Sequence, residues 1–256
     1  MSNLEVHESI LETVSDGQAL AVPRMRPASV GPHPLIVMLM DKPGIRDALR
    51  AFGCRLAANG YDVVLPDLYH RHGRMIGYGP AELAANPGAP DQLMTLMMSL
   101  TDDGIQNDLD AALEAVGADR PAGSMETAGC IGFCLGARAV FRAMMRLPDQ
   151  FKAGAMWHPS FLVDGAADSP HLTAGELAGS LYVGFGEADQ MMSVASMTPF
   201  IEAVSAVGDR VTIDILPGAD HAYTWPDART YNEAAAERAW SQTLALFGDI
   251  LDPTPT

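Results

Sequence analysis

The sequence is poor in basic residues. Lys and Arg total 16 against 32 Asp and Glu, so the net charge of the 256-residue chain is −16 at pH 7. A surface of this sign repels phosphate backbones and anionic membranes at long range, so we expect no nucleic acid or membrane partner. An anionic substrate needs a local positive cluster, such as Arg71, His72 and Arg74.

Cysteine is also scarce. Cys54, Cys130 and Cys134 are odd in number and unevenly spaced, which is not the pattern of a disulfide framework. The chain begins without the basic residues and apolar run of a signal peptide, which favours the cytoplasm. Cys130 and Cys134 do not have the spacing of a recognised metal-ligand pair, so we expect no metal.

Long hydrophobic runs and internal repeats are absent from the sequence. No apolar stretch approaches the roughly 18 residues that a membrane span needs. Hydrophobic residues nevertheless make up 48% of the chain, enough for a large core. The length suits one α/β domain over residues 1–256, and we expect the proline-containing tail 252–256 to be disordered.

Short apolar runs alternate with segments of helical periodicity. The runs that suit buried strands are residues 35–40, 61–66, 128–133, 153–157, 180–185 and 211–215. The segments of helical periodicity are 46–59, 102–116, 135–145, 197–207 and 231–247. Residues 1–30 are expected to form a hairpin or an extended entry. The alternation predicts a mostly parallel, doubly wound sheet flanked by helices, with ligands at the carboxyl ends of the strands.

Residues 72–101 depart from this alternation. Several glycines and prolines interrupt a segment that contains Met94, Met97 and Met98. We interpret the segment as a lid or flap over a site. The alternative is a surface excursion whose methionines fill gaps in the core, because Met is an adaptable packing residue.

A nucleophile motif follows one predicted strand. Gly132-Phe133-Cys134-Leu135-Gly136 matches the nucleophile elbow G-x-S-x-G, with sulfur in place of oxygen. Small residues are needed where the strand and the helix approach closely at so tight a turn. The start of the following helix favours the thiolate of Cys134. We expect Cys134 to be a nucleophile, and Cys54 and Cys130 to be buried, inert thiols.

An acid and a histidine follow in the order expected of an α/β-hydrolase fold. Asp189 ends the turn after the predicted strand 180–185, and His221 lies on the loop after the next strand. His221 is the only histidine after that acid. Asp189 is the preferred partner of the His221 ring, and Asp220 is the alternative.

These motifs, together with residues 60–69, 186–189 and 218–223, resemble the dienelactone hydrolase family over most of the chain. The resemblance implies a cofactor-free cysteine hydrolase of lactones or small carboxylic esters, of the carboxymethylenebutenolidase class. It implies that Cys134 attacks the ester carbonyl, that a thioacyl enzyme forms and that water activated by His221 releases the acid. Backbone N–H groups of Leu135 and Lys42 would then hold the oxyanion.

The resemblance also implies a role for Asp41. In the family an acidic residue at this position, usually Glu, holds the resting thiol. The shorter Asp41 stands there in this chain. The alternative is that Asp41 is a loop acid or a cap of the helix that begins near Arg46.

Substrate choice depends on residues near the histidine. Family members that open dienelactone have an arginine a few residues after it, where this chain has Ala222, Tyr223, Thr224 and Trp225. Trp225 favours a neutral or apolar acyl group, with Tyr223 beside it as a second candidate contact. Arg71 or Arg74 could supply a positive charge from the lid side, or both could be ordinary surface residues.

A rival function needs no turnover. A non-enzymatic member of the fold could bind a ligand, or use Cys134 as a redox-sensing thiol. The presence of Asp189 and His221 in the expected order favours the enzyme. The sequence leaves the oligomeric state and the physiological substrate open.

Overall fold

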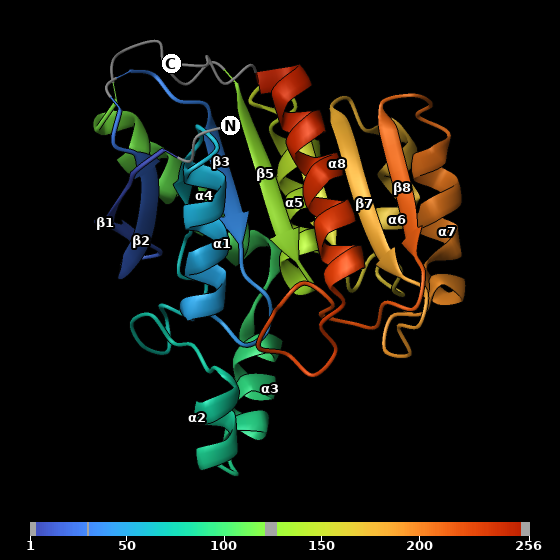
Figure 1. Ribbon diagram of the computed structural model, residues 1–256, viewed down its shortest axis with the longest axis horizontal. Helices are drawn as coiled ribbons and strands as arrows, with labels where there is room; N and C mark the ends of the chain where they lie inside the picture. Colours follow the sequence, from blue (N-terminus) through green and yellow to red (C-terminus); the bar gives the residue numbers. More distant parts are fainter. Residues whose placement is uncertain (1–3, 30, 121–126, 252–256) are drawn as a thin grey trace. The chain divides into compact units, whose positions relative to one another are not determined.

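The computed structural model describes residues 4–29, 31–120 and 127–251 (Figure 1). The tail predicted at 252–256 lies outside the described residues. The chain divides into two compact units, one ending at Ala128 and the other beginning at Gly129. The expectation of a single domain therefore stays a prediction.

The first unit contains a mixed sheet. Its strands are β1 (Val6–Ser15), β2 (Gln18–Pro27), β3 (Leu35–Leu39) and β4 (Asp62–Val64), in the order β1-β2-β4-β3. β1 and β2 form an antiparallel hairpin, β2 pairs antiparallel with β4, and β3 and β4 are parallel. The two-residue turn Asp16-Gly17 has φ values of 50° and 76°, which matches the twist of a hairpin. The predicted N-terminal hairpin is confirmed.

Four helices belong to the same unit. They are α1 (Asp47–Ala57), α2 (Pro80–Ala85), α3 (Ala89–Ser99) and α4 (Asp102–Ala118). Thr101 caps the N-terminus of α4, and its hydroxyl accepts a hydrogen bond from the Gly104 N–H at 3.1 Å. Asp102 and Asp103 place negative charge at the same end, where the helix dipole favours it.

The segment 72–101 contains α2 and α3, which the sequence analysis missed. Pro80 and Pro90 stand in the first turns of these helices, where proline is well tolerated, although in the sequence they look like helix breakers. Met94 and Met98 are 46% and 71% exposed. The alternative in which the methionines fill the core is therefore wrong for these two, and the lid stays a prediction.

The second unit is a parallel sheet with helices on both faces. Its strands are β5 (Ala128–Phe133), β6 (Phe151–Trp157), β7 (Ser180–Gly186) and β8 (Val211–Leu216), in the order β5-β6-β7-β8. Its helices are α5 (Leu135–Arg146), α6 (Pro170–Thr173), α7 (Val194–Ser205) and α8 (Glu233–Leu251), with a short 3₁₀ turn at Ala174–Glu176.

Each strand of this unit is followed by helix or loop that returns the chain to the next strand. Parallel register joins β6 to β7 and β7 to β8. α8 packs on β6 and β7, and α5 packs on β6 from the other face (Figure 1). β5 is buried along its length, as expected of a strand covered on both faces. The predicted βα alternation is confirmed here, with element ends shifted by a few residues.

In the part of the chain that the structure describes, no helix combines the length and the apolar character required to cross a membrane.

A buried ion pair joins β2 to β4. Arg24 donates from Nε and Nη2 to the two carboxylate oxygens of Asp62, at 2.8 and 2.7 Å. The two side chains are only 3% and 5% exposed. Removing one partner of such a pair leaves a charge with little solvation, which is far more costly than losing a surface pair.

We predict that Arg24→Met lowers the free energy of unfolding by about 3–5 kcal/mol, because the Asp62 carboxylate stays buried without its main partner. The matched control is Arg50→Met. Arg50 pairs with Glu8 at 2.7 Å, but these side chains are 45% and 44% exposed. That variant should lose no more than about 1 kcal/mol. Urea unfolding measures both, and equal losses would contradict the prediction.

Candidate active site

Cys134 lies at a sharp bend between β5 and α5. Its φ and ψ are 53° and −115°, a backbone conformation that residues other than glycine rarely adopt. A Cβ on Gly132 would lie 2.2 Å from the carbonyl oxygen of Gly136, so only glycine fits at position 132. The strained bend is the geometry of a nucleophile elbow, which presents one side chain at the end of a strand.

The Cys134 side chain is 9% exposed, and its sulfur lies 3.3 Å from the hydroxyl oxygen of Ser160. α5 begins at Leu135, directly after the cysteine. The first N–H groups of a helix lack intrahelical partners, so they can stabilise negative charge at this point. The oxyanion role of the Leu135 N–H stays a prediction.

His221 faces Asp189 from the next strand end. The Nδ1 of His221 lies 2.6 Å from Oδ2 of Asp189. The other Asp189 oxygen accepts hydrogen bonds from the N–H groups of Met191 and Met192, at 2.9 and 2.7 Å. Asp220 accepts instead from the backbone N–H of His221, at 2.7 Å. Of the two candidate acids, Asp189 is therefore the one that contacts the ring.

The pKa values of this pair shift in opposite directions. Burial alone raises the pKa of Asp189, but the hydrogen bond from His221 and those from the Met192 and Met191 N–H groups outweigh burial and lower it. Burial alone lowers the pKa of His221, but Asp189 and then Cys134 outweigh burial and raise it to about 10. These shifts favour the imidazolium form of His221 beside the Asp189 carboxylate.

The second ring nitrogen of His221 is turned to the thiol without a formed hydrogen bond. Among the described residues, no partner meets hydrogen-bond geometry at His221 Nε2, which is buried. Cys134 is nonetheless close enough to contribute to the raised pKa of the ring. The Cys134 sulfur therefore lies near Nε2 and forms its hydrogen bond with Ser160.

Two residues of the site, His158 and Ser160, were missed in the sequence. They follow β6, where parallel strands present functional side chains, and that position was the signal that could have found them. His158 is buried with a φ of 38°, and its ring centroid lies 5.1 Å from that of His221. A triad pattern of one nucleophile, one acid and one histidine in that order does not include either residue.

Tyr223 and Trp225 are both buried. The Tyr223 hydroxyl donates to the Gly184 carbonyl at 3.3 Å, and the Trp225 ring centroid lies 4.7 Å from that of Phe133. These contacts hold the loop after His221 against β5 and β7. Substrate contact by either ring stays a prediction.

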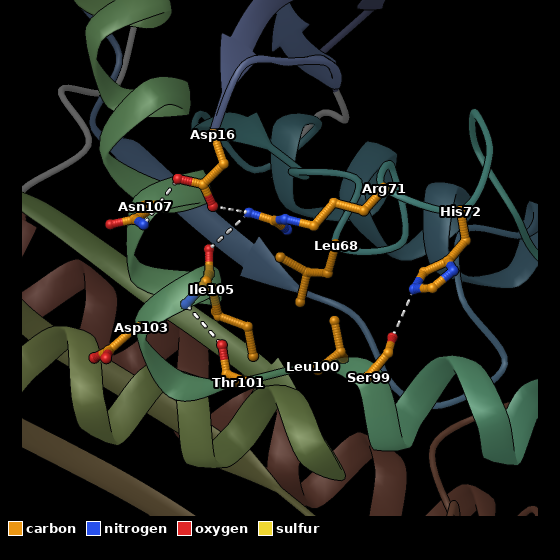
Figure 2. Close-up of a pocket in the computed structure, with 11 residues that line it drawn as sticks. Asp16, Leu68, Arg71, His72, Ser99, Leu100, Thr101, Asp103, Ile105 and Asn107 are labelled. Carbon is orange, nitrogen blue, oxygen red and sulfur yellow. Dashed lines mark hydrogen bonds and ion pairs between the residues drawn. The ribbon is translucent and has the colours of Figure 1, made fainter.

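The positive residues 71 and 74 are engaged with carboxylates of the first unit. Arg71 donates to Asp108 at 2.9 and 2.8 Å and to Asp16 at 2.6 Å. Arg71 and Asp16 line a pocket of about 280 Å³. Figure 2 shows Arg71 turned toward Asp16 at the wall of this pocket. Arg74 pairs with Glu12 at 2.5 Å. Substrate binding by either arginine stays a prediction.

Asp41 and Lys42 also lie in the first unit. Asp41 is buried, and its two oxygens accept from Nη1 and Nη2 of Arg46 at 2.6 and 2.9 Å. α1 has no side-chain cap, so the alternative in which Asp41 caps this helix is wrong. The Lys42 carbonyl accepts from the Tyr69 hydroxyl at 2.8 Å. The roles implied for Asp41 and for the Lys42 N–H stay predictions.

The other two cysteines differ from Cys134. All three are free thiols. Cys130 is fully buried, and burial raises its pKa, as expected of an inert core thiol. Cys54 is only half-buried, so the expectation of full burial is wrong for it. Burial, and then Glu8, raise its pKa as well.

The chain resembles known proteins over most of its length. A sequence model described as "Dienelactone hydrolase family" matches residues 20–251. A protein of Synechocystis sp. named "Putative carboxymethylenebutenolidase" is 28% identical over 226 residues, 86% of this chain and 88% of that protein. A protein of the same name from Escherichia coli K12 is 27% identical over 237 residues, 91% of this chain and 83% of the other.

Solved structures show the same fold. A "Putative Dienelactone Hydrolase" from Klebsiella pneumoniae matches with a TM-score of 0.80 at 23% identity, covering 95% of this chain and 99% of that one. An esterase of Pyrococcus furiosus matches with a TM-score of 0.69 at 17% identity, covering 96% and 93%. The predicted α/β-hydrolase fold is confirmed.

We predict that Asp189→Asn lowers the free energy of unfolding by about 1.5–3 kcal/mol at pH 6, the range for a hydrogen bond to a charged group. The folded pKa of His221 lies above its ordinary 6.5, so this stabilisation is complete below pH 6.5 and is lost as the pH rises through about 10. The lowered pKa of Asp189 keeps the stabilisation intact down to its ordinary value of 3.8.

Urea unfolding at pH 6 and at pH 10.5 measures this dependence. The loss caused by Asp189→Asn should be much smaller at pH 10.5. Asp220→Asn is the matched control, because that carboxylate contacts the His221 backbone N–H, and its effect should be similar at both pH values. An equal loss from Asp189→Asn at both pH values would contradict the assigned ion pair.

Proposed function

The chain belongs to the dienelactone hydrolase family, and on that premise we propose that it hydrolyses lactones or small carboxylic esters with Cys134 as the nucleophile. One observation carries the proposal. Cys134, Asp189 and His221 follow β5, β7 and β8 of one unit, and the His221 ring pairs with Asp189 at 2.6 Å.

The proposed reaction begins with an ion pair. In the resting site the thiol proton of Cys134 has already passed to Nε2 of His221, so a Cys134 thiolate lies beside an imidazolium that the Asp189 carboxylate stabilises. The raised pKa of His221 supports this protonation state at neutral pH. The thiolate then attacks the ester carbonyl, and the N–H group of Leu135 holds the oxyanion.

Two further steps complete the reaction. The tetrahedral intermediate expels the alcohol, which takes the proton from His221, and a thioacyl enzyme remains. Neutral His221 then removes a proton from water, the hydroxide attacks the thioester, and the acid product leaves as the Cys134 thiolate is restored. The proton taken from water stays on His221 beside the restored thiolate, which regenerates the starting ion pair, so the cycle closes without a cofactor.

The charges of the chain support a neutral substrate. The net charge is −16, and Arg71 and Arg74 are already paired with carboxylates of their own unit. Trp225 stands near the position at which family members that open dienelactone have an arginine. A substrate carboxylate would therefore find no ready cation among these candidates.

A redox sensor or ligand-binding protein is the rival proposal. A sensing thiol needs only ionisation and access, whereas the Asp189–His221 pair adds a base that can shuttle protons. This pair favours the enzyme. The same thiol chemistry favours a reducing compartment, which supports the proposed cytoplasmic location.

We predict that Cys134→Ala lowers kcat/KM for a neutral aryl ester by about 10⁴-fold or more, because loss of a nucleophile removes the covalent route. Cys54→Ala is the matched control and should keep activity, since its thiol lies on α1 in the other unit. Stopped-flow release of the phenol measures both variants, with circular dichroism as the check on folding. Wild-type rates from Cys134→Ala would rule out the assigned nucleophile.

We predict that a neutral lactone has a kcat/KM at least about 10-fold above that of a carboxylate-bearing lactone such as dienelactone. The reason is that the substrate carboxylate would find no cation to pair with and would be repelled by the negative chain. Steady-state kinetics with the two compounds at low and high salt measure the ratio. The ratio should shrink at high salt as the chain's negative field is screened. Preference for the anionic lactone would show that a cation does face the substrate.

A further inference from the structure

Ser160 is held against the nucleophile by two contacts. Its hydroxyl oxygen lies 3.3 Å from the Cys134 sulfur, and its backbone N–H donates to the Cys134 carbonyl at 3.0 Å. The side chain is almost fully buried, in the loop that follows β6. A buried hydroxyl fixed at this distance from a sulfur has its hydrogen-bond geometry set by the fold.

The backbone fixes Ser160 from both sides of the bend. The Cys134 N–H donates to the Trp157 carbonyl at 3.2 Å, so residues 157–160 bond to both the amide and the carbonyl of the nucleophile. The φ of 53° at Cys134 is maintained within this frame. The position of the Ser160 hydroxyl is therefore coupled to the elbow itself.

Two other residues, Asp41 and His221, are candidates for a hydrogen bond to the Cys134 sulfur. Both oxygens of Asp41, the residue implied for this task by family resemblance, accept hydrogen bonds from Arg46. His221 Nε2 has no hydrogen-bond partner among the described residues. The Cys134 sulfur is thus paired with a neutral hydroxyl in the resting site.

We propose that Ser160 is a positioning residue whose hydroxyl donates a hydrogen bond to the Cys134 thiolate. This hydrogen bond stabilises the negative charge on the sulfur and orients the sulfur for attack. The inference rests on the proposed function. A thiol is a weak donor, whereas a thiolate is a charged acceptor, and charge-assisted hydrogen bonds are about twice as strong as neutral ones. The hydroxyl therefore favours the ionised form. No electron or proton is exchanged with Ser160.

Several charged or titratable groups of the second unit lie near the same sulfur. His221, backed by Asp189, comes from the loop after β8, and the His158 ring, from the loop after β6, lies against the His221 ring rather than against the sulfur. The N-terminus of α5 adds its dipole. Ser160 is the neutral group among them, so removing its hydroxyl leaves each of these charges in place.

The test is the pH dependence of Cys134 alkylation by iodoacetamide, followed by peptide mapping so that Cys54 is counted separately. In Ser160→Ala the midpoint should move upward by about 1 pH unit, the effect of losing one hydrogen bond to a charged group. The kcat/KM for an aryl ester at pH 7 should fall about 10-fold and should recover as the pH is raised. A merely structural role would lower the rate without moving the midpoint.

Matched variants keep the test sharp. Thr224→Val removes another buried hydroxyl, one without a hydrogen-bond partner among the described residues, and should leave the midpoint unchanged. Ser160→Thr retains a hydroxyl and should restore the midpoint toward wild type. Ser160→Gly also removes the hydroxyl and adds no atom to the buried site, and serves if Ser160→Ala does not fold. An unchanged or lowered midpoint in a folded variant without the hydroxyl overturns the inference.

The alkylation readout needs no turnover, so the two proposals fail separately. A wild-type chain that shows the Ser160-dependent midpoint but hydrolyses no ester would support the role of Ser160 and contradict the proposed function. A chain whose esterase activity depends on Cys134 but whose midpoint ignores Ser160 would do the opposite.

Discussion

The backbone bend at Cys134 is the constraint from which the rest of the site follows. A residue with a side chain at φ 53° is strained, and it persists here because Gly132 allows the Gly136 carbonyl to approach and because residues 157–160 bond to both sides of the bend. The bend turns the sulfur away from the strand and sets it at the start of α5. A residue larger than glycine at 132 would remove the approach on which the geometry depends.

The second unit then supplies the partners in strand order. β6 is followed by His158 and Ser160, β7 by Asp189 and β8 by His221, so consecutive parallel strands end at one edge with polar groups. These polar groups differ in charge and in the contacts that they make. Asp189 and His221 form the ion pair, while the Ser160 hydroxyl lies within hydrogen-bonding distance of the Cys134 sulfur. In the proposed mechanism, the group that moves protons is therefore distinct from the group that fixes the nucleophile.

Much of this arrangement could be predicted from the sequence because its signals are local. Apolar runs followed by glycine-containing turns located β5 and β7, and the order Cys134, Asp189, His221 suggested the hydrolase fold. The sequence favoured Asp189 over Asp220 as the partner of the His221 ring, and the structure shows why. Asp220 directly precedes His221, and its carboxylate contacts the His221 backbone N–H instead of the ring. The contact of Ser160 with Cys134 and the Asp41–Arg46 ion pair could not be predicted either, because no spacing in the sequence encodes these contacts. The helices α2 and α3 were not predicted because proline was interpreted as a helix breaker. Proline is also common in the first turn of a helix, where Pro80 and Pro90 lie.

The central claim is that the sulfur of Cys134 becomes covalently acylated. Intact-protein and peptide mass spectrometry, after rapid acid quenching of the chain mixed with an aryl ester, measures this most directly. The account predicts one acyl group per chain on the peptide that contains Cys134, which appears within the first turnover and disappears as substrate is exhausted. Acylation at another residue, or steady ester hydrolysis without any acyl adduct on that peptide, would contradict it.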